Sequence, residues 1–159
     1  MKTRVLLLCN DFTGSKVHSN LYKELENQAV SQTIFSPIRR ISERGKNKFE
    51  FRCQDSKVIY SDLQKKYHRL FFHLKSNFLY NSLLRQINPS DYTITHASTL
   101  FTDGSISYKL YKKYNIPYIV AVRSTDLSIF FSGAVCPIAD ALISNKAVNI
   151  ETLFIIHFF

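Results

Sequence analysis

One turn of small residues with a lysine is the first segment whose composition suggests chemistry. It consists of Thr13, Gly14, Ser15 and Lys16 and stands between an apolar run and a segment of helical period. Backbone N–H groups and a lysine at the start of a helix suit a phosphate, so we predict a phosphate contact here. The spacing matches neither a Walker A loop nor the three-glycine dinucleotide turn, and a capped strand-to-helix turn remains the alternative interpretation.

Three further side chains are candidates for acid–base or electrostatic roles. His96 ends a predicted strand, and Arg123 and Asp126 follow the strongest predicted strand of the chain. A histidine at the end of a strand can donate a hydrogen bond to a substrate hydroxyl or transfer a proton. The alternatives are a structural role for His96, and an ion pair or a helix cap for Arg123 and Asp126.

The other histidines and the cysteines do not form a recognisable metal site. Three histidines lack a partner at ligand spacing, and we interpret them as part of solvated helix faces: His18, His68 and His73. The cysteines are widely separated and match neither a disulfide framework nor a zinc spacing: Cys9, Cys53 and Cys136. We therefore expect a reduced, cytoplasmic protein that holds no metal.

A basic and aromatic stripe occupies the middle of the chain. It combines two sets of side chains at helical spacing: Lys65, Lys66, Arg69 and Lys75, and Tyr67, Phe71, Phe72 and Phe78. Such a stripe could lie against anionic lipid. The alternative, which we favour, is an ordinary helix whose apolar side faces the core and whose basic side faces solvent.

The spacing of apolar residues along the sequence predicts the strands and helices that must position these segments. Short apolar runs typical of buried parallel strands alternate with segments of helical period. The predicted strands cover residues 4–9, 32–36, 49–53, 57–60, 92–96 and 116–122, and the predicted helices cover 16–28, 61–87 and 103–114. This order predicts an α/β fold with an open, mostly parallel, Rossmann-like sheet and flanking helices. Ligands of such sheets bind at the carboxyl ends of the strands, where the candidate residues should gather.

The composition limits the class of protein and of partner. The chain has 159 residues, with 21 Lys and Arg against 12 Asp and Glu and a net charge of +9. This length can build one globular core, and the apolar runs are too short to span a bilayer or to act as a signal peptide. The positive charge predicts an anionic partner: nucleic acid, a phosphorylated small molecule or an acidic membrane surface.

Residues 132–159 differ in composition from the rest of the chain. They contain three charged side chains: Asp140, Lys146 and Glu151. We therefore predict a domain over residues 1–131 and a divergent tail over 132–159, produced by a truncation or a frame shift. Within the tail the pattern predicts a helix over 138–147 and an apolar strand over 153–159.

Three segments of the sequence resemble the N-terminal half of bacterial family 4 glycosyltransferases: residues 2–11 with the turn at Gly14, residues 91–104 and residues 108–126. The similarity extends over residues 2–131. The resemblance implies one half of a GT-B fold, in which two Rossmann-like domains face a cleft. The first domain of that fold holds the acceptor, and the second holds the nucleotide-sugar donor.

The resemblance also implies an activity, namely retaining transfer of a sugar from a nucleoside diphosphate to an acceptor hydroxyl, with no cofactor and no required metal. The turn from Thr13 to Lys16 would approach the donor diphosphate, while His96 and the loop from Arg123 to Asp126 would line the cleft. The implied partners are a nucleotide sugar and a glycan or lipid-linked acceptor of cell-envelope polysaccharide synthesis. The implied location is the cytoplasm, in peripheral contact with the inner face of an anionic membrane.

The sequence departs from the family pattern in three respects. Ser98 stands where the family often has the second histidine of a His-x-His pair, and Arg123 stands where many members have a histidine. The donor domain and its paired glutamates are not part of this sequence, so we predict that the chain is inactive by itself. The alternative hypothesis is a basic binding module for nucleic acid or an anionic membrane. Nucleic acid is disfavoured, because the sequence contains no recognised motif with interleaved strand aromatics.

Overall fold

The computed structural model describes residues 3–122, in which strands and helices alternate. Short 3₁₀ helices are labelled η, and the elements in chain order are β1 (Arg4–Leu8), α1 (Lys16–Asn27), β2 (Ser31–Ser36), η1 (Ile41–Glu43), β3 (Lys57–Tyr60), η2 (Lys66–Arg69), α2 (Phe72–Leu84), η3 (Pro89–Asp91), β4 (Ile94–Ala97), α3 (Thr102–Tyr114) and β5 (Tyr118–Val120). The elements predicted over 138–147 and 153–159, and the boundary at residue 131, lie outside the described residues.

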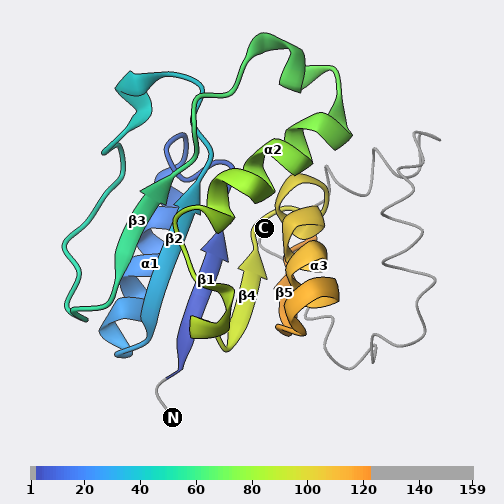
Figure 1. Cartoon of the computed structure of the whole chain (residues 1–159). Helices are drawn as coiled ribbons and strands as arrows, with labels where there is room; N and C mark the ends of the chain where they lie inside the picture. The colour runs from blue at the N-terminus through green and yellow to red at the C-terminus, as the bar shows by residue number, and fades with distance from the viewer. Residues whose placement is uncertain (1–2, 123–159) are drawn as a thin grey trace.

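The strands form one five-stranded sheet in the order β3-β2-β1-β4-β5, and each neighbouring pair is parallel. The strand arrows point the same way in Figure 1, so their carboxyl ends share one edge of the sheet. The predicted α/β fold with an open, Rossmann-like sheet is therefore confirmed. β1 and β2 have the most buried side chains because they lie inside the sheet, as the continuous apolar run of β1 predicts.

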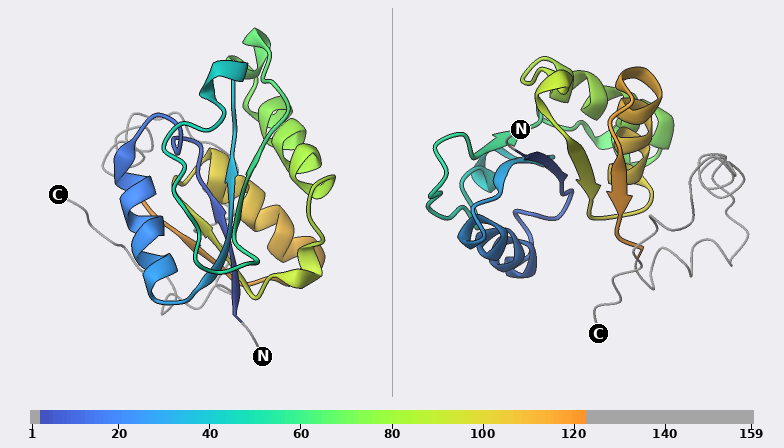
Figure 2. Two further views of the ribbon diagram at one scale, coloured as in Figure 1. Left: turned by 90° about the vertical axis from the view of Figure 1, so that its left-hand side faces the viewer. Right: turned by 90° about the horizontal axis from the view of Figure 1, so that it is seen from below.

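Helices cover both faces of the sheet (Figure 2). α1 lies on one face, and α2 and α3 lie together on the other. Alternate side chains of β1 enter two separate cores, because successive residues of a strand point to opposite faces. Leu7 packs with Phe12 and Tyr22 on the α1 face. Leu6 and Leu8 pack on the face of α2 and α3, with Leu79, Leu83, Ile106 and Leu110.

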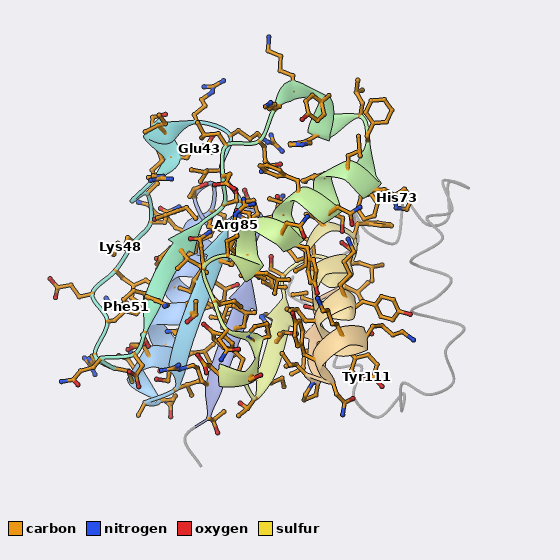
Figure 3. The ribbon with its side chains drawn as sticks, viewed as in Figure 1. Glu43, Lys48, Phe51, His73, Arg85 and Tyr111 are labelled. Carbon is orange, nitrogen blue, oxygen red and sulfur yellow. The ribbon has the colours of Figure 1, made fainter. Side chains whose placement is uncertain are left out.

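The long connection from β2 to β3 contains no strand among its described residues, so the predicted strand over 49–53 is wrong. Its alternating pattern has another cause. The rings of Phe49 and Phe51 lie 4.8 Å apart and pack against the core on the α1 face. Lys48 and Phe51 are labelled on this connection in Figure 3.

A buried carboxylate fixes this connection to α1. Glu26 accepts hydrogen bonds from Cys53 N at 2.6 Å, Gln32 Nε2 at 2.8 Å and Ser56 Oγ at 2.9 Å. Burial acts to raise the pKa of Glu26, but hydrogen bonds from Cys53, Gln32 and Ser56 outweigh it and hold the pKa below its usual value. The carboxylate therefore replaces backbone pairing as the anchor of residues 53–56.

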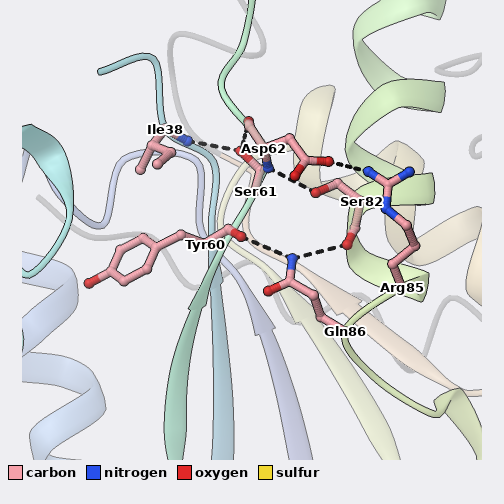
Figure 4. A network of polar contacts seen from close by, with 7 residues as sticks. All are labelled: Ile38, Tyr60, Ser61, Asp62, Ser82, Arg85 and Gln86. Carbon is pink, nitrogen blue, oxygen red and sulfur yellow. Dashed lines mark hydrogen bonds and ion pairs between the residues drawn. The ribbon is translucent and has the colours of Figure 1, made fainter. Parts of the chain in front are cut away.

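The helix predicted from Ser61 begins eleven residues later, at Phe72. Both predicted caps have other partners (Figure 4): Ser61 Oγ accepts a hydrogen bond from Ile38 N at 3.0 Å, and Asp62 N donates to Ser82 Oγ at 2.9 Å. Asp62 also pairs with Arg85 on α2. These contacts hold the chain extended after β3, since each of them joins a residue of this segment to a distant element.

The apolar residues before and at the start of α2 consequently face solvent. The exposed fraction is 80% for Leu70 and 55% for Phe71, and three more side chains of this segment are exposed: Leu63, Tyr67 and Leu74. The favoured interpretation of the stripe as a core-facing helix is therefore wrong for Tyr67 and Phe71, whereas Phe78 packs against the core as that interpretation predicts. The core contacts of α2 come instead from Leu79 and Leu83, further along the helix.

We expect Glu26→Gln to lower the free energy of unfolding by about 1–3 kcal/mol at pH 7, because the amide turns an N–H group toward other donors. The measurement is urea unfolding followed by circular dichroism. Because the folded-state pKa of Glu26 is lowered, its contribution is present above about pH 4.5 and is lost as the pH falls below it.

The matched control is Glu24→Gln, an exposed glutamate on the same helix. It should change the free energy of unfolding by no more than about 0.5 kcal/mol. Equal effects of the two substitutions would contradict the anchoring role of Glu26.

Candidate functional site

The order of the strands reverses between β1 and β4, which is the topological switch point of the sheet. From β1 the chain proceeds to β2 on one side, whereas β4 and β5 extend the sheet on the other side. In open α/β sheets, ligands bind at the carboxyl edge where the direction of strand addition reverses. The connections that follow β1 and β4 are therefore the first place to look for a site.

A buried carboxylate joins these two connections. Asp103, in the first turn of α3, accepts hydrogen bonds at Oδ2 from Asn10 N at 3.2 Å, Ser98 Oγ at 2.9 Å and Thr99 Oγ1 at 3.0 Å. Its side chain is buried, and Oδ1 has no hydrogen-bond partner. Burial raises the pKa of Asp103 to about 6, although these three hydrogen bonds and the charge of Lys75 act in the opposite direction.

Sequence reasoning did not assign a role to Asp103. An Asp at the start of a predicted helix is usually interpreted as an exposed cap, and its burial depends on the approach of β1 to β4. The available signal was the neighbouring pair of hydroxyl residues, Ser98 and Thr99, directly after a strand. Ser98 donates one of the hydrogen bonds to this carboxylate.

His96 lies on β4, in register with Leu7 of β1 and Ile119 of β5. It therefore belongs to the α1 face of the sheet, which Leu7 also lines. Burial lowers the pKa of His96, and the nearby His18 lowers it further, so the neutral imidazole is favoured at pH 7. A neutral imidazole can both donate and accept a hydrogen bond.

The solvated-face interpretation is wrong for two of the three other histidines. His18 is buried on α1 next to Tyr22, with ring centroids 6.0 Å apart. His68 is buried in η2, where its Nδ1 accepts a hydrogen bond from Lys65 N at 3.1 Å. His73 is exposed, as predicted. His18 lies near enough to lower the pKa of His96, so the start of α1 is close to the carboxyl end of β4.

The turn from Thr13 to Lys16 is the strand-to-helix turn that the sequence predicts. Ser15 caps α1 by accepting a hydrogen bond from Val17 N at 3.3 Å. The N–H groups of Gly14 and Ser15 both donate to the carbonyl of Asp11, at 3.1 and 3.0 Å, and so are occupied in this conformation. Lys16 is exposed at the first position of the helix. A phosphate contact at this turn stays a prediction, with Lys16, which forms no ion pair within residues 3–122, as its cation.

Two of the predicted catalytic residues, Arg123 and Asp126, lie outside the described residues. Of the predicted set, the structure thus places His96 and the turn from Thr13 to Lys16 at the same edge of the sheet, with His18 of α1 near His96. Cys9, at the end of β1, is buried, and burial raises the pKa of its thiol to about 11. The thiol therefore stays protonated and is not a nucleophile at neutral pH.

Within residues 3–122, no cluster of three or more His, Cys, Asp and Glu side chains is arranged to hold a metal ion. The same part of the chain contains no helix whose length and hydropathy would let it cross a membrane.

Comparison with known structures assigns the fold to a class. The chain is similar to apo UGT2 of Phytolacca americana, with a TM-score of 0.54 and 12% identity over 92% of this chain and 34% of that one. It is also similar to a UGT transferase from Siraitia grosvenorii in complex with UDP, with a TM-score of 0.46 and 12% identity over 77% of this chain and 28% of that one. The second likeness is too weak to add to the first. No protein-family model matches the sequence, and no curated protein matches it significantly.

The fold of this chain is therefore similar to that of one part of UGT2. The chain spans about a third of the length of UGT2, as the 34% coverage shows. At 12% identity this likeness shows the fold alone. The substrate and the chemistry have to be argued from the site.

We expect the stability of the protein to depend on the ionisation of Asp103. Because its folded-state pKa of about 6 exceeds the usual 3.8, the folded protein binds this proton more tightly than the unfolded chain does. The contribution of Asp103 to the free energy of unfolding is thus greatest below about pH 4 and falls as the pH rises through 6, by at most about 3 kcal/mol.

The substitution Asp103→Asn tests this dependence, because an amide oxygen can still accept the three hydrogen bonds at Oδ2. Urea unfolding of both proteins between pH 4 and pH 7.5 should show the variant gaining stability relative to the parent as the pH rises. Asp11→Asn controls for the change in net charge, since Asp11 is an exposed carboxylate in the adjoining loop. A stability difference between the Asp103 variant and the parent that does not change with pH would contradict the expectation.

Proposed function

We propose that this chain is the acceptor-side domain of a retaining glycosyltransferase that moves a sugar from a nucleoside diphosphate to an acceptor hydroxyl. The observation that carries the proposal is the reversal of strand order between β1 and β4, where Asp103 joins the two connections and His96 lies nearby. The likeness of the fold to UGT2 and the resemblance of three sequence segments to family 4 glycosyltransferases support the same class.

Each side chain has a defined part in this proposal. Lys16 and the amino end of α1 attract the leaving diphosphate, whose negative charge grows in the transition state. The neutral imidazole of His96 donates a hydrogen bond to a hydroxyl of the transferred sugar or of the acceptor. Arg123 and Asp126 are assigned to the same cleft by the sequence. The proposed mechanism uses no metal ion, as the resemblance to family 4 implies, and Lys16 together with the positive end of the α1 dipole offsets part of the diphosphate charge.

The proposed acceptor is a glycan or a lipid-linked glycan of cell-envelope polysaccharide synthesis, and the protein acts in the cytoplasm against the inner face of a membrane. Support comes from the exposed apolar side chains of residues 63–74, which alternate with exposed Lys65 and Lys66. A surface of this kind suits an anionic lipid interface.

We expect nucleotide sugars to bind weakly, with a dissociation constant in the millimolar range, because one domain supplies only part of the contacts. Titration of the ¹⁵N-labelled chain with UDP-, GDP- and ADP-sugars should shift the amide signals of residues 13–17 and the imidazole signals of His96. Lys16→Gln should weaken the shifts, whereas Lys23→Gln, an exposed lysine of the same helix, should not.

Shifts that spread over the whole basic surface, or that appear with RNA and vanish steeply with salt, would contradict this proposal and favour a basic binding module. A nucleotide sugar that shifts no signal near Lys16 or His96 would contradict the assigned donor contacts.

We also expect the chain to release no nucleoside diphosphate above background when it is mixed with the same donors and with glycan acceptors. The physical reason is that the described residues form one Rossmann-like domain, whereas the GT-B mechanism uses two domains that face a cleft. The measurement is a coupled assay for the released nucleoside diphosphate. Appreciable turnover would overturn the proposal that the chain is inactive by itself.

A further inference from the structure

A polar pocket of about 240 Å³ lies at the carboxyl edge of the sheet, apart from the groups assigned above. It is formed by the connections that follow β2 and β3 and by the starts of α2 and α3. Its polar lining is Arg39, Gln64, His68, Lys75 and Thr102. Sites that bury a whole drug-sized ligand usually measure roughly 300–1,000 Å³. This pocket therefore suits one chemical group of a larger ligand.

The charge of the pocket is positive. No carboxylate lines it, and in the part of the chain that the structure describes, neither Arg39 nor Lys75 forms an ion pair. Lys75 Nζ donates a hydrogen bond to Thr102 Oγ1 at 3.2 Å, which fixes the amino group at the start of α3. Burial lowers the pKa of Lys75 and the charge of Arg39 adds to this, while Asp103 acts in the opposite direction. Two cations that repel each other across a pocket are stabilised by an anion between them.

His68 adds a neutral donor to this lining. Lys65 N donates to its Nδ1, so the neutral ring carries its proton on Nε2. Burial lowers the pKa of His68, and Lys65 and Lys75 lower it further, which keeps the ring neutral at pH 7. The ring packs against that of Phe78 in a tilted arrangement, with ring centroids 4.4 Å apart, which restricts its orientation. The pocket thus combines two cations with neutral hydrogen-bonding groups.

An exposed apolar surface adjoins the pocket. Leu70 lines the pocket and is 80% exposed, and it belongs to a set of exposed apolar side chains that we call the apolar rim: Leu63, Tyr67, Leu70, Phe71 and Leu74. The rim and five of the seven residues that line the pocket come from one segment, residues 63–75. In Figure 1 this segment rises beyond the carboxyl ends of the strands and leads into α2. A ligand held in the pocket can therefore extend over the rim.

We propose that this pocket binds the phosphate or diphosphate group of a lipid, whose apolar chain lies on the apolar rim. The charge of Arg39 and Lys75 selects the anionic group, and the adjoining rim selects an amphiphile over a free phosphate. This proposal rests on and deepens the proposed function, because it names the group by which a lipid-linked acceptor is held, namely its phosphate or diphosphate, while a sugar hydroxyl of the same acceptor receives the transferred sugar. The argument for the pocket uses no donor contact, so the two can fail separately.

The test uses three soluble probes and the full chain: pyrophosphate, geranyl diphosphate and geraniol. Isothermal titration calorimetry should show binding of geranyl diphosphate about tenfold tighter than binding of pyrophosphate, because only the former reaches the rim. Geraniol should bind more weakly than geranyl diphosphate, because it lacks the anionic group.

Matched substitutions separate the pocket from the general positive charge. Arg39→Gln and Lys75→Gln should each weaken the binding of pyrophosphate and of geranyl diphosphate by about five- to thirtyfold. Arg44→Gln and Lys23→Gln remove the same charge at exposed positions outside the pocket and should have little effect. Arg39 is exposed, so its substitution leaves the fold intact even if a change at the half-buried Lys75 does not.

The rim is tested by Leu70→Ser and Phe71→Ser. Both substitutions should lower the affinity for geranyl diphosphate and leave the affinity for pyrophosphate unchanged. Ile41→Ser is the control, since Ile41 is 71% exposed and belongs neither to the pocket lining nor to the apolar rim. Equal losses in the pocket variants and their controls, or equal affinities for the two diphosphates, would overturn the proposal. The proposal would also be overturned if Lys16→Gln abolished the binding of geranyl diphosphate and Arg39→Gln did not affect it. That result would place the anion at the turn before α1. Absence of donor shifts at Lys16 would count against the proposed function and not against this site.

Discussion

The carboxylate of Asp103 is the contact on which the geometry of the site depends. The connections after β1 and β4 separate at the point where the strand order reverses, and nothing in a parallel ladder ties them together beyond the last strand residues. Asp103 does so with hydrogen bonds to Asn10, Ser98 and Thr99. Because one oxygen accepts all three, the two loops and the start of α3 share a single anchor. Positions such as His96 and Thr102 are therefore fixed relative to each other by this group.

This anchor also explains how one edge of the sheet can carry two different kinds of polar surface. Parallel strands send all their carboxyl ends to one edge, but the crossover helices divide that edge into two sides. On the α1 side stand His96, His18 and the exposed Lys16. On the side of α2 and α3 stands the pocket with Arg39 and Lys75. A donor diphosphate and an acceptor phosphate would thus meet separate cations, which keeps two anionic ligands from competing for one site.

The sequence predicted the sheet well because the apolar run of β1 and the helical period of α1 are local signals. It failed where distant contacts replaced local ones. Phe49 and Phe51 alternate like strand residues, yet they pack on a core while Glu26 anchors the loop that follows them. Ser61 and Asp62 have the types of helix caps but bind Ile38 and Ser82 instead. The burial of Asp103 was beyond prediction for the same reason, since it arises only when β1 pairs with β4.

The largest error of sequence reasoning lies at the apolar rim, and its cause is physical. Leu63, Tyr67, Leu70 and Leu74 recur at helical spacing, and a helical apolar stripe normally faces a core because burial stabilises the fold. Here these apolar side chains remain exposed to water, which forgoes the free energy that their burial would contribute to folding. They adjoin a pocket whose two cations repel each other. Both costs fall on the same segment of the chain and both are relieved by one kind of molecule, an anion that carries an apolar chain. Exposed apolar side chains and unpaired cations at the same place are unfavourable for folding, and a bound ligand explains them better.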